Sequence, residues 1–278
     1  MPIRTADEYI ESLRGRKLRV FLFGQPVEEP VDHPVIRPSI NAVAETYRLA
    51  EEDPELATAE SKLSGGKRVN RFLQVTQDVN DVVMQNRMQR RLGQRTGTCF
   101  QRCVGMDATN ALYSVTFDTD QAHGTQYHAR FQEFVKHMQR ENFVVGGAMT
   151  DPKGDRSKAP HEQADLDMFV RVVERRPDGV VLRGAKMHQT GCLNSHWLLV
   201  MPTMRLGEAD KDYAICAAIP VDHPGITYIY GRQSCDSRAL EAGDVDAGNA
   251  VFGGQEAMIV FEDVFVPTSH VFMDGEYD

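Results

Sequence analysis

The sequence predicts an α+β protein, with a helical N-terminal domain at residues 1–142 and an antiparallel β-barrel domain at residues 143–278. Two observations predict this order. Apolar residues recur at helical spacing through much of the first half, whereas the second half changes to short apolar runs separated by turn-forming residues. The composition, 41% hydrophobic and 26% charged over 278 residues, is that of an ordinary globular protein with room for two domains.

The first half begins with a capping box, Thr5-Ala-Asp-Glu8, which predicts a short helix bearing Tyr9, Ile10 and Leu13 on one face. Residues 18–23 alternate like a short strand or an extended arm. Four prolines between residues 24 and 38 predict a rigid connection without helix. Helices are expected at residues 41–50, capped by Ser39, and at residues 70–92, 99–112 and 127–140.

The second half shows no helical run between its apolar segments. Pro177-Asp-Gly179 is a typical hairpin turn. Strands are expected at residues 143–149, 168–173, 180–187, 197–201, 213–219, 226–230 and 257–265. Such a series favours an antiparallel barrel or sandwich.

Charge and hydropathy exclude several classes of function. The formal net charge of −9 offers no broad surface for phosphate backbones, so we expect no nucleic-acid partner. No apolar run approaches the roughly 18–20 residues of a membrane span, and the first residues lack the apolar core of a signal peptide. Five cysteines, an odd number, make a secreted disulfide framework improbable. We therefore expect a cytoplasmic protein without a membrane partner.

Cys99 and Cys103 form a C-x-x-x-C pair, which on a helix would place both thiols on one face. Two thiolates on one face can hold a metal ion or one edge of an iron–sulfur cluster. On spacing alone, two partly buried thiols without a ligand are the more common outcome.

Three further segments carry candidate binding or catalytic groups. The small and charged residues of Gly146–Arg156 can present backbone N–H groups to a ligand, although an irregular surface loop is equally compatible. Thr190 and Asn194 offer neutral groups suited to a flat heterocycle, while His188 and His196 are read first as hydrogen-bonding residues. Glu256 follows two glycines and is a candidate acid or base, or simply a solvated carboxylate.

Together these segments resemble the 4-hydroxyphenylacetate 3-hydroxylase family, whose helical-then-β order is that of the acyl-CoA dehydrogenase fold. The resemblance runs from residue 9 to the end of the chain. It is closest to the cluster-containing CoA-thioester dehydratases of that family. It rests on the stretches YIESLR, DHPVIRPSIN, RLGQRTGTCFQRCVGMDA, GAMTDPKGDR, RGAKMHQTG, YGRQSCD and FGGQEA.

The resemblance implies cofactors and site residues. Cys99 and Cys103 match two of the three cysteines of a [4Fe–4S] cluster, and Arg90 and Gln101 match polar residues beside the cluster and substrate. Glu256 matches an active-site carboxylate, and Thr190 would face the reactive edge of the flavin. The implied FAD-binding residues are Met149, Thr150, Lys153, Asp155, Arg156, Gln189 and Thr190.

The implied reaction is dehydration of 4-hydroxybutyryl-CoA to crotonyl-CoA, with isomerisation of vinylacetyl-CoA. In the family the chain continues beyond the position of Asp278 into a C-terminal helical domain, which this sequence lacks. We therefore expect a chain that is inactive alone and acts on an acyl-CoA together with a separately encoded C-terminal half or in a homo-oligomer. A flavin-dependent hydroxylase, a non-catalytic fragment and a flavin- or CoA-binding subunit remain the alternatives.

Overall fold

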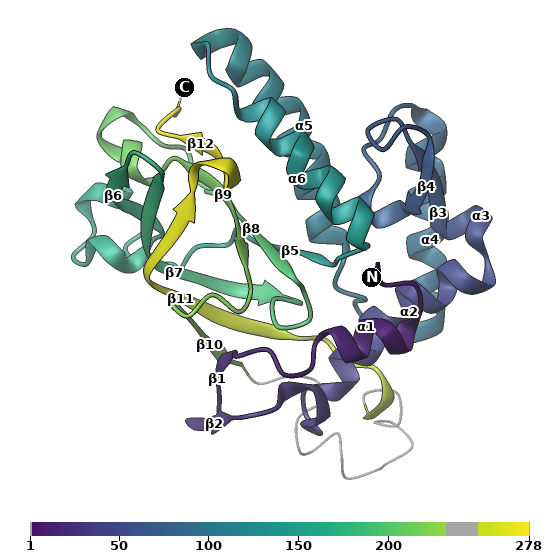
Figure 1. The fold of residues 1–278 in the computed structure, drawn as a ribbon. Helices are drawn as coiled ribbons and strands as arrows, with labels where there is room; N and C mark the ends of the chain where they lie inside the picture. Colours follow the sequence, from purple (N-terminus) through teal and green to yellow (C-terminus); the bar gives the residue numbers. More distant parts are fainter. Residues whose placement is uncertain (1, 232–249, 278) are drawn as a thin grey trace.

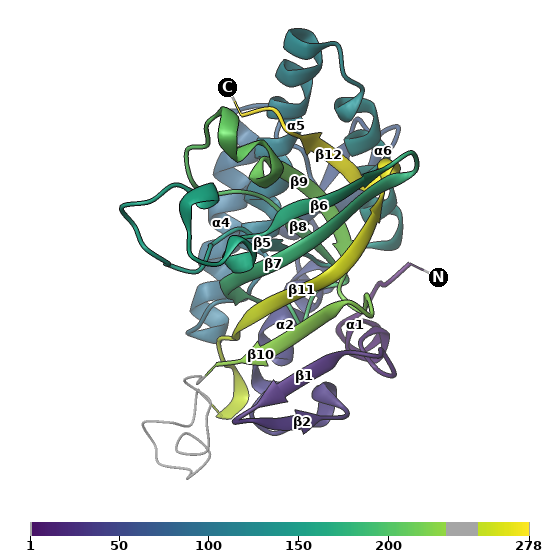
Figure 2. The same ribbon diagram turned by 90° about the vertical axis from the view of Figure 1, so that its left-hand side faces the viewer.

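The computed structural model describes residues 2–231 and 250–277, and its mixture of helices and sheets confirms the expected α+β class. A six-stranded sheet has the strand order β2-β1-β10-β11-β7-β6, and a four-stranded sheet has the order β12-β9-β8-β5 (Figures 1 and 2). The six-stranded sheet contains β1 (Arg19–Leu22), β2 (Gln25–Val27), β6 (Arg171–Arg176), β7 (Gly179–Thr190), β10 (Ile226–Tyr230) and β11 (Glu256–Pro267). The four-stranded sheet contains β5 (Val145–Ala148), β8 (Trp197–Val200), β9 (Ile215–Pro220) and β12 (Val271–Asp274).

The four-stranded sheet is the middle of three layers. Alternate residues of β8 show this, because Leu198 and Val200 join the core shared with the six-stranded sheet, while Leu199 joins the core shared with α5 (Cys103–His123) and α6 (Tyr127–Glu141). Burial on both faces explains why β8 and β9 are continuous apolar runs in the sequence.

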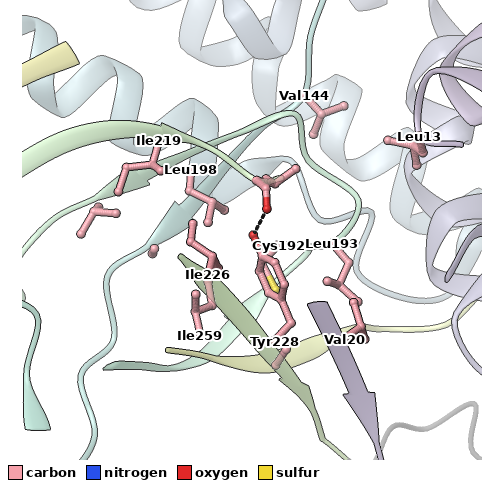
Figure 3. Close-up of a cluster of buried hydrophobic side chains, with 14 of the residues drawn as sticks. Leu13, Val20, Val144, Cys192, Leu193, Leu198, Ile219, Ile226, Tyr228 and Ile259 are labelled. Carbon is pink, nitrogen blue, oxygen red and sulfur yellow. Dashed lines mark hydrogen bonds between the residues drawn. The ribbon is translucent and has the colours of Figure 1, made fainter. Parts of the chain in front are cut away.

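Figure 3 shows part of the core between the two sheets. Tyr228 lies among Leu198, Ile226 and Ile259, and its buried hydroxyl donates a hydrogen bond of 2.7 Å to the carbonyl oxygen of Val221. Cys192 lies in the same core and is fully buried, which identifies it as a packing residue.

The remaining helices gather at the side of the molecule that carries the β3–β4 hairpin (Figure 1). A smaller core joins Leu49, Phe72, Met88 and Phe100, which come from widely separated parts of this region. The elements are α1 (Ala6–Ser12), α2 (Arg37–Glu52), α3 (Pro54–Ala57), β3 (Thr58–Ser61), β4 (Lys67–Asn70) and α4 (Val79–Thr96). Among the described residues, no helix combines the length and the apolar character that crossing a membrane requires.

The expected antiparallel barrel is not found. Two pairs of strands are parallel, β1 with β10 and β5 with β8, and the described strands form a six-stranded, a four-stranded and a two-stranded sheet, none of which closes into a barrel. The hairpin of β1 and β2 joins the six-stranded sheet from the N-terminal end of the chain, so distant segments build one sheet. Short strands of this kind carry no sequence signal for parallel or antiparallel pairing, and only their partners decide it.

Several expected helix boundaries are also wrong. Ser39 is not a cap but lies inside α2, which begins at Arg37 within the proline-rich connection. Asn70 ends β4, and α4 begins only after Asp78, whose side chain accepts a hydrogen bond from the backbone N–H of Asp81. The capping box of Thr5 and Glu8 and the hairpin turn before Gly179 are confirmed.

Candidate functional site

The loop that follows β5 is held against β7 by two buried side chains. The Lys186 ammonium donates to the carbonyl oxygens of Met149 (2.9 Å) and Met201 (2.7 Å) and to Oδ1 of Asp151 (2.6 Å). The Gln189 side chain accepts from the Met149 N–H (3.0 Å) and donates to the Thr150 carbonyl oxygen (2.9 Å). Every donor of the ammonium is satisfied, so the loop has a defined position.

A β-bulge makes this arrangement possible. Gln189 pairs with Ala257 but Lys186 pairs with Ile259, so β7 has one more residue than β11 between these two pairs. His188 within the bulge has a φ of 52°, in the left-handed region. In a regular strand the side chains of residues 186 and 189 would point to opposite faces, whereas the bulge turns both inward.

This loop borders a cavity of about 830 Å³. Four basic side chains line it, and its apolar lining includes Phe169, Met187 and Met204. The two carboxylates in the lining, Asp151 and Asp155, are each engaged, the first by Lys186 and the second by Ser157. The basic residues are Lys153, Arg156, Lys158 and Arg205. The cavity therefore suits a ligand with a flat apolar part and an anionic part.

The two cysteines meet at the N-terminus of α5, although not as expected. Cys99 lies in the loop before the helix and Cys103 is the first helical residue, so the predicted helix at residues 99–112 begins four residues late. The thiols are nevertheless in contact. The hydrogen bond from Cys103 lowers the pKa of Cys99 to about 6 and raises that of Cys103. Cys99 is exposed and Cys103 is half-buried.

The α5 N-terminus adjoins β5, the strand that leads into this loop, because glycines allow the two backbones to approach. A Cβ atom on Gly147 would lie 2.3 Å from the Cγ1 atom of Val104, and one on Gly105 would lie 1.9 Å from the Val145 carbonyl oxygen. The cysteine pair is thereby brought beside the segment that borders the cavity.

Gln101 lies between the cysteines, but its side chain is directed into the interior. It has a φ of 64° and is 2% exposed. Its amide donates to the carbonyl oxygens of Ser39 (3.0 Å) and Gly253 (3.1 Å) and accepts from Asn194 (2.7 Å). It therefore ties the cysteine loop to the segment before Glu256.

Glu256 and Thr190 are direct partners across β11 and β7. The Glu256 carboxylate lies 3.5 Å from Nδ1 of His188, and both side chains are more than half exposed. The charge of Glu256 opposes the lowering of the Cys99 pKa, and Gln101, which lies between the two cysteines, donates to the carbonyl oxygen of Gly253, three residues before Glu256. Glu256, Thr190 and the cysteine pair thus form one neighbourhood.

The other candidate residues lie apart from this neighbourhood or inside the fold. Arg90 is an exposed residue of α4. Asn194 is fully buried with its amide on Ser39 and Gln101, so its expected role as a heterocycle-binding group is wrong for this arrangement. His196 is a partly buried hydrogen-bonding residue, and its role in hydrogen bonding is as expected. Cys235, from the matched stretch YGRQSCD, lies outside the described residues.

Sequence reasoning missed Lys186 as the anchor of the loop. A lysine in a strand that also carries Arg183 and His188 reads as one of several solvated side chains. Its only sequence signal was its position within the stretch RGAKMHQTG.

The side chains of the site fit the cofactors that the resemblance implies. The cavity's four cations and apolar lining suit a flavin dinucleotide, with its pyrophosphate and planar ring. The cysteine pair suits two ligands of an iron–sulfur cluster. Within residues 2–231 and 250–277, no group of three or more histidine, cysteine, aspartate or glutamate side chains could hold a metal ion.

The chain belongs to the 4-hydroxyphenylacetate 3-hydroxylase family, because residues 5–273 match the region described as 4-hydroxyphenylacetate 3-hydroxylase N terminal. It is 54% identical over 280 residues to the 4-hydroxybutyryl-CoA dehydratase/vinylacetyl-CoA-Delta-isomerase of Clostridium aminobutyricum, covering 99% of this chain and 57% of that protein. It is 26% identical to the oxygenase component of a Geobacillus 4-hydroxyphenylacetate 3-monooxygenase, over 99% of this chain and 56% of that protein.

Two solved structures of members of this family have the same fold as this chain. An oxygen-tolerant archaeal 4-hydroxybutyryl-CoA dehydratase from N. maritimus superimposes with a TM-score of 0.96 and 64% identity, over 99% of this chain and 55% of that one. The FAD complex of a 4-hydroxyphenylacetate 3-monooxygenase oxygenase component superimposes with a TM-score of 0.80 at 22% identity over 99% of this chain and 56% of that one, so it shares the fold. The chain therefore spans a little over half the length of these relatives.

Proposed function

We propose that this chain forms part of a 4-hydroxybutyryl-CoA dehydratase that binds FAD in the 830 Å³ cavity and one edge of a [4Fe–4S] cluster at Cys99 and Cys103. The observation that carries the proposal is that Gln101, between the two cysteines, packs against Gly191 next to Thr190 and bonds Gly253 in the segment that leads to Glu256, the cross-strand partner of Thr190. The 54% identity to a dehydratase, against 26% to a monooxygenase, supports the same assignment. The remaining cluster ligands would come from polypeptide outside the described residues, and the chain's own activity requires that polypeptide.

When bound, the flavin supplies one-electron chemistry that acidifies an unactivated C–H bond, and the cluster supplies a Lewis acid for the departing hydroxyl group. The chain's own residues place the reactants. Lys186 and Gln189 fix the backbone of Met149 and Thr150 at the cavity wall. Lys153 and Arg156 neutralise phosphate charge.

Glu256 is the residue of this neighbourhood that we assign to proton transfer. It is exposed toward solvent, it stands beside Thr190 on the neighbouring strand, and the imidazole of His188 lies within ion-pair distance of its carboxylate. A carboxylate can accept the substrate proton and later return it. Gln101 holds the cysteine loop and the Gly253–Glu256 segment at a fixed separation, and we assign it as a positioning residue. Arg90 is retained as a candidate for binding the acyl-CoA from α4.

The flavin site is tested by titrating the purified protein with FAD and following flavin fluorescence. The variant Lys153→Ala/Arg156→Ala should weaken FAD binding by about tenfold or more, because two cations of the cavity are lost. The control Lys17→Ala/Arg87→Ala removes the same charge from exposed positions elsewhere and should change binding by less than about twofold. Equal affinity in both variants would refute the assignment.

The cluster ligands are tested by anaerobic reconstitution with iron and sulfide in the presence of the C-terminal portion of a related dehydratase. Cys99→Ala/Cys103→Ala should abolish bound iron, whereas Cys192→Ala/Cys216→Ala, which removes two buried packing thiols, should retain it. Iron content that is unchanged in the first variant would overturn the cluster assignment and leave the flavin assignment intact.

A further inference from the structure

A second cavity, of about 640 Å³, lies on the helical side of the molecule and belongs to no part of the site described above. Its walls come from the N-terminal residues, the β3–β4 hairpin and the ends of α2 and α6. None of its lining residues is shared with the cavity beside Lys186. Its volume is within the range of small-molecule sites.

Basic side chains dominate this cavity although the whole chain is acidic, with a net charge of −9. One acidic residue, Glu51, is among the lining side chains. The basic residues are Arg4, Lys67, Arg68, Lys136 and Arg140. Such a concentration of one sign in a concave surface attracts anions.

The state of these cations shows which are available to a ligand. Arg68, Lys136 and Arg140 form exposed ion pairs with Glu55, Glu133 and Glu141 respectively. Exposed pairs of this kind are weak and exchange readily with other anions. The side chains of Arg4 and Lys67 have no hydrogen-bond or ion-pair partner among residues 2–231 and 250–277.

Asn70 supplies an independent indication of a ligand. It lines the cavity and is 5% exposed, and its Oδ1 atom accepts from the Phe72 N–H. Its Nδ2 atom is buried and has no hydrogen-bond partner within the described part of the chain. A buried donor of this kind is costly to leave unsatisfied, and an acceptor on a ligand would satisfy it.

The cavity also has an apolar wall, contributed by Ile3, Leu63 and Val69. Cations and an amide donor beside an apolar surface match a molecule that combines phosphate with a planar ring. We propose that this cavity binds the phosphate groups and base of an adenine nucleotide, either a free nucleotide or the nucleotide portion of a CoA thioester. The proposal stands apart from the flavin and cluster assignments.

Isothermal titration of the purified protein with ADP, with adenosine 3′,5′-bisphosphate and with inorganic phosphate tests it. We expect saturable binding of at least one nucleotide, tighter than that of phosphate, and weakened by added salt. A preference for the 3′,5′-bisphosphate identifies the CoA source, and a preference for ADP identifies a free nucleotide.

Two variants locate the site. Arg4→Ala/Lys67→Ala should weaken nucleotide binding by about tenfold or more, because two unpaired cations are removed. Asn70→Asp keeps the oxygen that caps Phe72 but replaces the buried donor with a negative charge, so it should weaken binding and also lower the unfolding midpoint, because the new carboxylate is buried without a partner.

A control variant distinguishes the loss of this cavity's cations from a general loss of positive charge. Lys17→Ala/Arg87→Ala carries the same change in net charge at exposed positions elsewhere and should bind nucleotide within about twofold of the parent protein. All titrations use protein saturated with FAD, so that the added nucleotides do not enter the cavity assigned to the flavin. The proposal is overturned if no nucleotide binds, if phosphate binds as tightly as the nucleotides, or if the Arg4/Lys67 variant binds as well as the control.

Discussion

Replacing Lys186 by methionine should destabilise the protein by about 3–5 kcal/mol, because it leaves the Asp151 carboxylate as an unpaired buried charge. The side chains of Lys186 and Asp151 are 2% and 6% exposed, and their charged atoms lie 2.6 Å apart. The variant also removes the hydrogen bonds that the Met149 and Met201 carbonyl oxygens accept. After the substitution, Asp151 retains only its 3.0 Å hydrogen bond from the Thr203 hydroxyl among the contacts of its carboxylate with the described residues.

A second variant separates the charge from the packing. Lys186→Met/Asp151→Leu removes both charges, so the buried-charge penalty disappears and about 1–3 kcal/mol should remain lost for the two carbonyl oxygens. The double variant should therefore be more stable than Lys186→Met alone. Lys67→Met, on an exposed lysine without a side-chain partner in the described chain, should change stability by no more than about 0.5 kcal/mol.

Urea unfolding followed by circular dichroism measures these differences, and the transition midpoints report them if the slopes are equal. If Lys186→Met does not fold, recovery of folded protein in the double variant tests the same reasoning. Limited trypsin digestion should cut faster after Lys153 and Arg156 in Lys186→Met, because the loop is released. A loss below about 1 kcal/mol for Lys186→Met, or a double variant less stable than it, would refute the reasoning.

Three further outcomes are expected. Burial lowers the pKa of His196 well below 6.5, and its Nδ1 atom accepts the Val144 N–H at 3.0 Å, so the unfolded chain takes up a proton first as pH falls. Below pH 6.5 the free energy of unfolding should therefore fall by about 1.4 kcal/mol per pH unit more steeply than in a His196→Gln variant. Urea unfolding of both proteins at a series of pH values measures this, and the same pH dependence in both would contradict it. Gly105→Ala should lower the free energy of unfolding by about 1–3 kcal/mol or more, because the new Cβ atom would overlap the Val145 carbonyl oxygen. Gly93→Ala has open space around it and should raise the free energy of unfolding by about 0.5–1 kcal/mol through the higher helix propensity of alanine in α4. Thermal melts that rank the two variants in the opposite order would disprove the close contact at Gly105. Thr5→Ala should cost about 1 kcal/mol through loss of the α1 capping box, and an unchanged melt would show that α1 is held by packing alone.

Local signals in the sequence were sufficient where a segment depends on its neighbours in the chain. Thr5 and Glu8 cap α1 because both partners lie within one turn. The turn before Gly179 joins β6 and β7 because proline, aspartate and glycine favour that backbone conformation. The strand at residues 226–230 was predicted to the residue, since its apolar run is bounded by turn formers. The resemblance to the family came from motifs and did not depend on the boundaries of any element.

Errors arose where distant partners decide the structure. Ser39 has the composition of a helix cap, but its hydroxyl donates to the Ile36 carbonyl and accepts from the buried Asn194 amide, so it sits inside α2. The expected barrel failed because the pairing of β1 with β10 and of β5 with β8 is parallel, and such partners lie far apart in the chain. The alternation of apolar and polar residues within a strand does not indicate which distant strand it pairs with, or in which direction.

The sequence by itself determined the α+β class, the family and the identities of Cys99, Cys103, Thr190 and Glu256 as candidates. Only the tertiary structure decided which candidates meet. The bulge at His188 turns Lys186 and Gln189 to the same face, and the glycines of β5 and α5 let the cysteine loop approach the cavity. The physical reason is that a site is made by contacts between distant segments, whose geometry depends on backbone irregularities and close packing that residue type alone does not encode.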